Sequence, residues 1–169
     1  MLATFEPLLA EFREEAAITK RVLERVPGDK LSWKPHAKSM SLGQLALHIA
    51  AVPRNLAKGL QQETVEARFS PNGPTEPANV REILETFEAG VRDMEACIQN
   101  MTEESAKGTW QLQSGGKPII NRPRAGVLRS VVCNHIYHHR GQLSVYLRLL
   151  DVPVPVIYGR SADESPVEQ

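Results

Sequence analysis

Long stretches with an apolar residue at every third or fourth position dominate this sequence and constrain its fold more than any other feature. They run over residues 5–26, from residue 41 to about 58, over residues 79–101 and over residues 123–150. This spacing is typical of a helix with one apolar face. No convincing alternation of apolar and polar residues, the mark of a strand, lies between them. The sequence therefore predicts an all-α fold.

Local signals indicate where these helices begin and end. Pro27-Gly28 ends the first. Ser41 and Gln44 form the S-x-x-Q pattern of a capping box, which predicts that the second helix starts at Ser41. Pro53 lies inside that helix and predicts either a kink or an early break.

Four helices of this length are most simply arranged as a four-helix bundle within a single domain that spans residues 1–169. The connections over residues 27–41, 59–78 and 102–123 are long for such a bundle. Loops of this length usually carry function or cross the bundle. The second of them is long enough for the second and third helices to run parallel.

The composition of the chain indicates which partners are disfavoured and which cellular compartment is expected. The chain has 20 basic and 20 acidic residues, so no overall field favours nucleic acid or an anionic membrane. No apolar run approaches the roughly 20 residues of a membrane span, and the first residues lack the pattern of a secretory signal. Cys97 and Cys133 are isolated in the sequence and are interpreted as free thiols. We therefore expect a cytoplasmic protein.

Three of the five histidines fall within residues 135–139, in the fourth helical stretch. His135 and His139 are one turn apart, so they project from the same face, as in helices that present two imidazoles to one metal ion. A third ligand must come from elsewhere, and His48 in the second helix is the best candidate. Three imidazoles suit zinc, nickel, iron(II) or copper and leave coordination positions open for water or substrate.

The alternative is that these histidines are ordinary core residues. A single histidine on an apolar face is more often hydrogen-bonded than metal-bound. His135 and His139, however, continue the apolar face of the fourth helix. Burying several imidazoles without partners costs a few kcal/mol each, and a shared metal would satisfy their acceptor nitrogens. His138 is expected beside the site or at its rim, and His36 in solvent.

The residues that follow this pair carry two further signals. Gly141 lies in mid-helix, where glycine costs about 1 kcal/mol relative to alanine, which suggests close approach of another helix or chain. Gln142 is three residues from His139, so two interpretations stay open. It is either buried and hydrogen-bonded near the site or an ordinary polar residue at the edge of the bundle.

Together these features resemble the DinB family. The resemblance rests on four segments in the same order: Leu31-Ser32-Trp33-Lys34-Pro35, Ser41-Leu42-Gly43-Gln44-Leu45 leading to His48, the run from His135 to Leu143, and Val154-Pro155-Val156-Ile157-Tyr158-Gly159. It implies the DinB/YfiT-like four-helix bundle, in which three histidines that match His48, His135 and His139 hold a divalent metal. It also implies a homodimer. Characterised members include thiol-cofactor-dependent transferases and a mycothiol-dependent isomerase.

The resemblance favours a metal-dependent enzyme, specifically a transferase that acts with a low-molecular-weight thiol on a small molecule. Zinc or nickel is the expected metal, and it would lower the pKa of a bound water or thiol. One alternative is a stress-response protein that binds a metal or small molecule without catalysis. Another is a metal that only joins the second helix to the fourth.

No catalytic residue can be assigned from the sequence. No acidic residue shares the face of the histidines, and Tyr137 and Tyr146 are the remaining candidates for a general base. Cys133 lies about 200° around the helix from His135 and should face away from the metal. Cys97 has no histidine nearby in the sequence to activate it.

Overall fold

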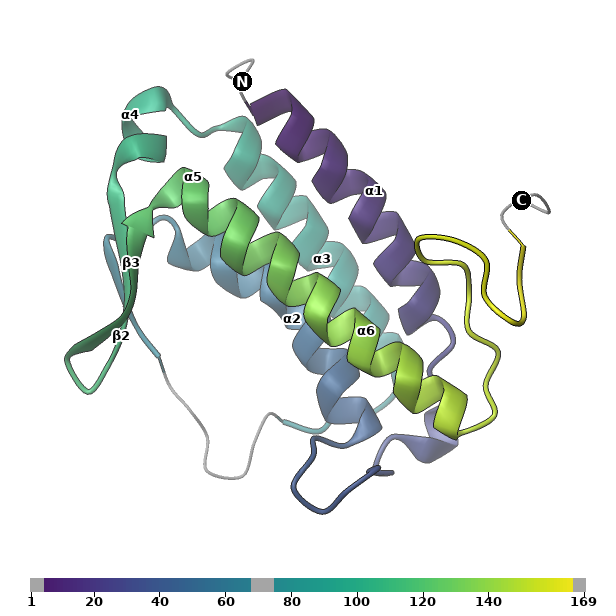
Figure 1. Cartoon of the computed structure of the whole chain (residues 1–169). Coiled ribbons are helices and arrows are strands. Elements are labelled where there is room, and N and C mark those ends of the chain that lie inside the picture. Colours follow the sequence, from purple (N-terminus) through teal and green to yellow (C-terminus); the bar gives the residue numbers. More distant parts are fainter. Residues whose placement is uncertain (1–4, 68–74, 166–169) are drawn as a thin grey trace.

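The computed structural model describes residues 5–67 and 75–165. Its longest elements are helices that lie side by side (Figure 1): α1 (Glu6–Leu23), α2 (Leu42–Gly59), α3 (Val80–Gln99) and α6 (Asn134–Leu149). Shorter helical elements are η2 (Gly28–Lys30), α4 (Glu103–Lys107) and α5 (Arg124–Val127). Each of the four expected helical stretches is present.

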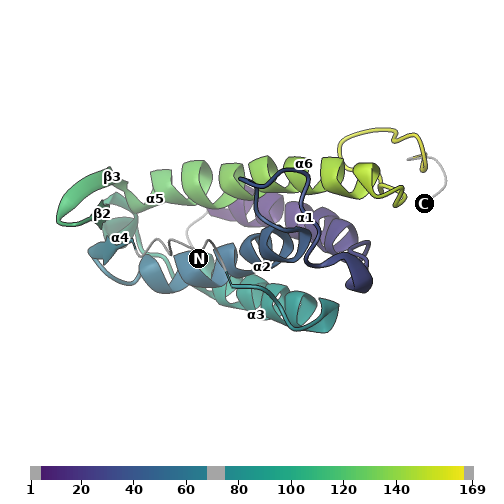
Figure 2. The same ribbon diagram turned by 90° about the horizontal axis from the view of Figure 1, so that it is seen from below.

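The four long helices form a ring of contacts, because α1 and α2 each pack against both α3 and α6. The helices α2 and α3 run parallel (Figures 1 and 2), as the length of their connection had suggested. Gly43 faces Pro77 at the start of both helices, whereas Arg54 pairs with Asp93 further along, at 3.2 Å. At Gly90, an added Cβ would lie 3.1 Å from the main-chain nitrogen of Arg54, so glycine permits the close approach of the two helices.

The local start signals are confirmed. The hydroxyl of Ser41 accepts a hydrogen bond from the main-chain N–H of Gln44 at 3.0 Å, and the Gln44 side chain accepts one from the N–H of Ser41. The side chain of Asn79 caps α3 in the same way through the N–H of Glu82. Pro53 lies inside α2, which continues to Gly59. The early break at Pro53 was therefore wrong.

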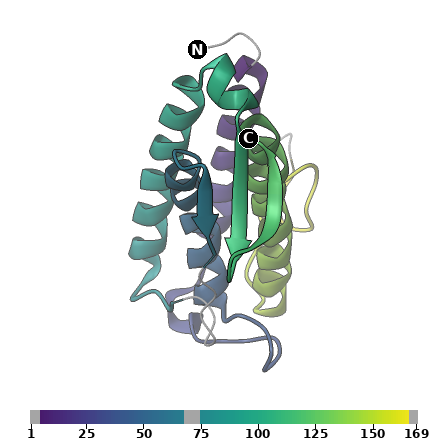
Figure 3. The same ribbon diagram turned by 90° about the vertical axis from the view of Figure 1, so that its left-hand side faces the viewer.

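The expectation of an all-α fold was also wrong. A small sheet with the strand order β1 (Thr64–Glu66), β2 (Thr109–Ser114) and β3 (Lys117–Pro123) covers one end of the helices (Figure 3). Strand β1 pairs with β2 in parallel, and β2 and β3 form an antiparallel hairpin. The protein is therefore mostly helical with a three-stranded sheet.

The hairpin had a sequence signal that was overlooked. Trp110 and Leu112 alternate with polar residues, and Gly115-Gly116 follows them. Both glycines have positive φ, +56° and +75°, which a two-residue hairpin turn of type I′ requires. Trp110 is buried, and its indole N–H donates to the carbonyl of Gly59 at 3.0 Å. The sheet is thereby attached to the end of α2.

The fourth helical stretch is composite. Between α5 and α6 lies the π-helical segment η3 (Leu128–Cys133). A π turn holds more residues than an α turn, so it shifts which side chains face inward. The fully buried residues that follow are Ile136, Arg140, Leu143 and Leu147, whereas His135, His139 and Tyr146 are half-buried. Such segments occur frequently at functional sites.

The segment that follows α6 returns along the molecule to α1 (Figure 1) and is held there by polar contacts. Arg21 donates to the carbonyl of Val156, and Arg25 forms an ion pair with Glu164 at 2.6 Å. Arg148 pairs with Asp163 near the end of α6. The C-terminal segment therefore packs on two helices that are themselves in contact.

The core between the long helices is built from large apolar side chains. Those that are at most 2% exposed include Phe12, Leu45, Ile49, Phe87 and Met94. Within residues 5–67 and 75–165, no helix combines the length and the apolar character that crossing a membrane requires.

Candidate metal centre

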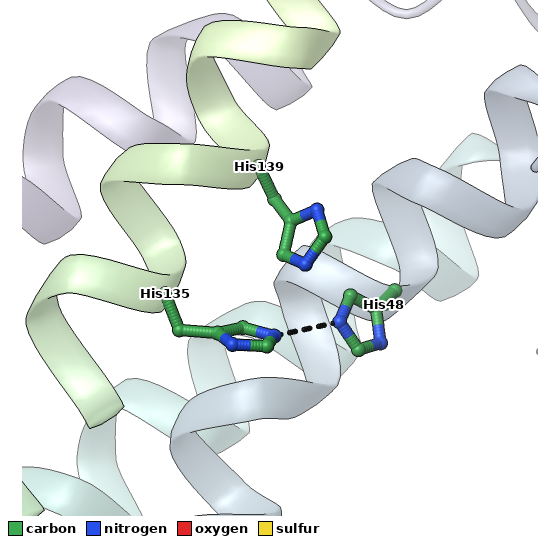
Figure 4. Close-up of side chains that lie close together, drawn as sticks. All are labelled: His48, His135 and His139. Carbon is green, nitrogen blue, oxygen red and sulfur yellow. Dashed lines mark hydrogen bonds between the residues drawn. The ribbon is translucent and has the colours of Figure 1, made fainter. Parts of the chain in front are cut away.

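Three histidines from two helices converge at one point. His48 projects from α2, and His135 and His139 project from α6 (Figure 4). One ring nitrogen from each lies within 4.8 Å of the other two. The Nε2 atoms of His48 and His135 are 2.9 Å apart, and the ring centroids are separated by 4.5 to 5.1 Å. The fold thus brings together the three residues that the sequence had singled out.

The packing of α2 against α6 explains this convergence. Leu60 at the end of α2 contacts Arg124 at the start of α5, while Tyr146 near the end of α6 contacts Met40 just before α2. The two helices therefore run antiparallel, and His48 lies opposite the turn that contains His135 and His139. All three imidazoles are half-buried, so their far sides remain accessible to solvent.

The environment keeps these imidazoles neutral. Burial is the largest cause that lowers the pKa of His135, to about 4, and the neighbouring His139 and His48 lower it further. Burial also lowers the pKa of His48 and of His139. All three are therefore uncharged at neutral pH, and a neutral imidazole is the form that binds a metal.

A hydrogen bond from His139 to Gln142 selects the tautomer of His139. The Nδ1 atom of His139 lies 2.7 Å from Oε1 of Gln142. An amide oxygen can only accept, so Nδ1 carries the proton and Nε2 keeps its lone pair. Metal-binding histidines usually have such a partner on the second nitrogen. Of the two interpretations of Gln142, the hydrogen bond near the site is present, whereas its side chain is exposed at the edge of the helices.

The donor set fits a divalent transition metal. Two ligands at about 2.1 Å from one ion lie about 3.0 Å apart at a right angle and about 3.4 Å apart at the tetrahedral angle. The 2.9 Å between the nitrogens of His48 and His135 is close to the first value. In the part of the chain that the structure describes, no carboxylate or thiol joins the three imidazoles in this group.

The other two histidines lie outside this group. His138 is exposed, and its ring centroid is 4.8 Å from that of His139, so it lies at the rim, as expected. His36 is exposed in the first long connection, where its Nδ1 accepts a hydrogen bond from the N–H of Lys38.

Neither tyrosine that was considered as a general base has a free hydroxyl directed at the histidines. The hydroxyl of Tyr137 donates to Glu11 of α1 at 2.9 Å, and burial raises its pKa. The hydroxyl of Tyr146 donates to the carbonyl of Met40 at 3.3 Å. Both hydroxyls therefore serve packing between elements.

Both cysteines are free thiols, as expected. Cys133 is buried on the side of the helix that carries Tyr137, and Cys97 is half-buried in α3. Burial is the largest cause that raises the pKa of each thiol. Neither belongs to the histidine group.

Sequence reasoning missed the importance of Arg140, which follows His139 directly. Its side chain is 1% exposed and forms an ion pair with Glu15 of α1 at 2.7 Å. It also donates to the hydroxyl of Thr19, and its guanidinium lies over the rings of Tyr137 and Tyr158 at 5.4 and 4.9 Å. The signal that could have shown its burial is helical spacing. Arg140 lies four residues after the apolar Ile136, so both side chains share one face of α6, about 100° around the helix from the histidines.

The sequence suggested that another helix or chain comes close to Gly141, and no helix of the described part of this chain does so. An added Cβ at this position would meet no atom within 4 Å among the described residues. Contact with another chain therefore stays a prediction.

Comparison with known proteins finds relatives over nearly the whole chain. The sequence model that describes the DinB family matches residues 1–168 of this chain. The uncharacterized protein YrdA of Bacillus subtilis (strain 168) is 25% identical over 167 residues, which cover 97% of this chain and 93% of YrdA. A second protein of that organism, YjoA, is 24% identical over 142 residues, which cover 83% of this chain and 87% of YjoA.

Solved structures show the same fold. A DinB-like protein from Bacillus cereus ATCC 10987 superposes with a TM-score of 0.70 at 22% identity, covering 90% of this chain and 97% of the other. The crystal structure of YjoA from Bacillus subtilis superposes with a TM-score of 0.69 at 22% identity and the same coverage.

Proposed function

The chain belongs to the DinB family, and from this premise we propose that it binds one divalent transition metal ion through His48, His135 and His139. The observation that carries the proposal is the convergence of three neutral imidazoles whose ring nitrogens lie within 4.8 Å of one another. Zinc or nickel is the proposed metal, because imidazole nitrogen suits both ions. The four long helices would then form the four-helix bundle of DinB/YfiT-like topology around this ion.

We further propose that the protein is a metal-dependent enzyme, and specifically a transferase that uses a low-molecular-weight thiol. A divalent metal with three protein ligands acts as a Lewis acid and leaves positions open for a small molecule. The role of His48, His135 and His139 is to hold the ion in their neutral form. The role of Gln142 is to keep the proton of His139 on Nδ1, so that Nε2 faces the site.

A second candidate is a protein that binds a metal or small molecule without catalysis, as in a stress response. One observation favours it. Within the described residues, no carboxylate joins the histidine group, and the hydroxyls of Tyr137 and Tyr146 are engaged elsewhere. Among the residues that the structure describes, neither a carboxylate nor a free tyrosine hydroxyl is therefore in place to act as a general base at this site.

Metal analysis of the purified and dialysed protein tests the binding proposal. One equivalent of zinc or nickel per chain is expected for the unaltered protein. His135→Ala or His139→Ala should abolish stoichiometric binding, because two imidazoles hold a metal weakly. His138→Ala is the matched control and should retain most of it, because His138 is exposed at the rim. Full occupancy in the double variant His135→Ala, His139→Ala would contradict the assignment.

The hydrogen bond between Gln142 and His139 can be tested separately from the ligands. Gln142→Leu removes the acceptor for Nδ1 of His139 without touching a ligand, and losses of such partners typically weaken metal binding about 10-fold to 100-fold. Titration with a competing chelator measures this change. An unchanged affinity in Gln142→Leu would show that the hydrogen bond does not orient the imidazole.

A screen of metal-loaded protein with small thiols and electrophiles separates the two functional candidates. A transferase should consume both substrates at a rate that depends on the metal and falls to background in His135→Ala. Stoichiometric binding without turnover across the panel would favour the non-catalytic candidate.

A further inference from the structure

A cavity lies at the C-terminal half of α2, beyond the turn that carries His48. It is a cleft of about 700 Å³ between the C-terminal halves of α2 and α3, bounded by α4 and by Arg124. Ala57 of its wall lies nine residues after His48, which is about 180° around α2 and about 13 Å along its axis. The cleft is therefore separate from the candidate metal centre and belongs to no function described so far.

The cleft combines an apolar floor with a polar rim. Ala57, Leu60 and Met101 line it and are almost completely buried. Its polar lining residues are Lys58, Gln61, Asp93, Asn100, Ser105 and Arg124. Sites for small organic molecules have this composition and typically enclose about 300 to 1,000 Å³.

The charges in the lining favour an anion. Asp93 is the one carboxylate among the lining residues, and Arg54 already pairs with it at 3.2 Å. Within the described residues, neither Lys58 nor Arg124 has a carboxylate within 4.0 Å. The two cations of the cleft therefore lack anionic partners, although the whole chain has equal numbers of basic and acidic residues.

The guanidinium of Arg124 is fixed in position. Its Nε and Nη2 atoms donate to the carbonyls of Leu60 and Gln62, each at 2.9 Å. A Cβ atom added to Gly108 would lie 2.6 Å from Nη1 of Arg124. Glycine at position 108 therefore leaves the space that this nitrogen occupies. Because carbonyl oxygens hold the group without neutralising it, its charge is available at the edge of the cleft.

We propose that this cleft binds a small organic anion, with an apolar body against Leu60 and Met101 and a carboxylate, sulfonate or phosphate group near Lys58 and Arg124. Cys97 lies in the wall and is half-buried, so its thiol reports on occupancy. The proposal does not depend on metal binding, because the cleft shares no lining residue with the histidine group.

The probe for the test is 8-anilinonaphthalene-1-sulfonate, which carries an apolar body and one sulfonate. Fluorescence titration of the full chain should show saturable binding. Ala96→Trp places a large side chain in the cleft from an exposed position on α3, and should weaken binding at least tenfold. Lys58→Gln removes one cation and should weaken it about twofold to fivefold.

Matched controls lie outside the cleft. Ala10→Trp and Lys34→Gln make the same changes at exposed positions of α1 and the first connection, and both should bind as the unaltered protein does. Bound probe should also slow the alkylation of Cys97 by N-ethylmaleimide severalfold, as measured by mass spectrometry. Unchanged affinity in Ala96→Trp, or unchanged alkylation of Cys97 at saturating probe, would overturn the proposal.

Discussion

The guanidinium of Arg140 and the carboxylate of Glu15 form an ion pair of 2.7 Å in which the two side chains are 1% and 13% exposed. Arg140 follows His139 in α6, and Glu15 lies on α1. The pair therefore joins the helix that carries two of the candidate ligands to the helix packed beside it. The rings of Tyr137 and Tyr158 lie against the same guanidinium.

Removing one member of this pair should destabilise the fold. Arg140→Met leaves the carboxylate of Glu15 buried without a cation, which typically costs about 3 to 5 kcal/mol of the free energy of unfolding. Urea denaturation measures the loss. The matched control is Arg13→Met, which breaks the exposed pair with Glu95 and should cost less than about 1 kcal/mol. A loss of similar size in both variants would contradict the special role of Arg140.

The stability of the metal-free protein should depend on pH through the histidines. The unfolded-state pKa of histidine is about 6.5, whereas burial lowers that of His135 to about 4 in the folded protein. Between these values the unfolded chain binds more protons, so the free energy of unfolding decreases as the pH falls through this window and levels off below it. Because the site is partly exposed, His135 should contribute on the order of 1 kcal/mol.

Urea denaturation of the metal-free protein at pH 7 and pH 5 measures this dependence. His135→Gln has no titrating group at that position and should lose less stability between the two values than the unaltered protein does. The difference between the two proteins separates His135 from the carboxylates, which titrate at lower pH. Equal losses would show that burial does not shift the pKa of His135.

Any activity that is found should depend on the metal and not on a protein thiol. Burial raises the pKa of Cys97 and Cys133, so neither thiol is readily ionised at neutral pH. The double variant Cys97→Ser, Cys133→Ser should keep the activity, and a chelator should remove it. Activity that survives the chelator but is lost in the double variant would require a different mechanism and leave the fold unaffected.

We expect a homodimer that uses the outer face of α6. Gly141 has open space around its Cα, and Val145 and Leu149 continue the same face with side chains 56% and 58% exposed. Light scattering at micromolar concentration should give twice the mass of one 18.8 kDa chain. Val145→Asp places a charge on this face and should shift the mass toward one chain, whereas Ile119→Asp on the sheet, at a side chain that is 52% exposed, should not. A single-chain mass for the unaltered protein would refute the dimer.

The sequence by itself determined the features that depend on neighbouring residues. The starts of α2 and α3 follow from Ser41 and Asn79, because a capping hydrogen bond spans three residues. The pairing of His135 with His139 follows from the helical repeat, because residues four apart share a face. The hairpin of β2 and β3 also depends on neighbouring residues, because Gly115-Gly116 forms its turn. This local signal was overlooked.

Only the tertiary structure decided the features that depend on distant residues. Strand β1 forms by pairing Thr64 with Gln111, and the two β-branched residues Thr64 and Val65 are too short a run to indicate a strand by themselves. The π-helical segment before His135 turns Arg140 into the core, where Glu15 from the far end of the sequence neutralises it. The packing of α2 against α6 likewise places His48 beside His135. Local hydrogen bonds set the helices, whereas side-chain packing and buried charge between them set the site.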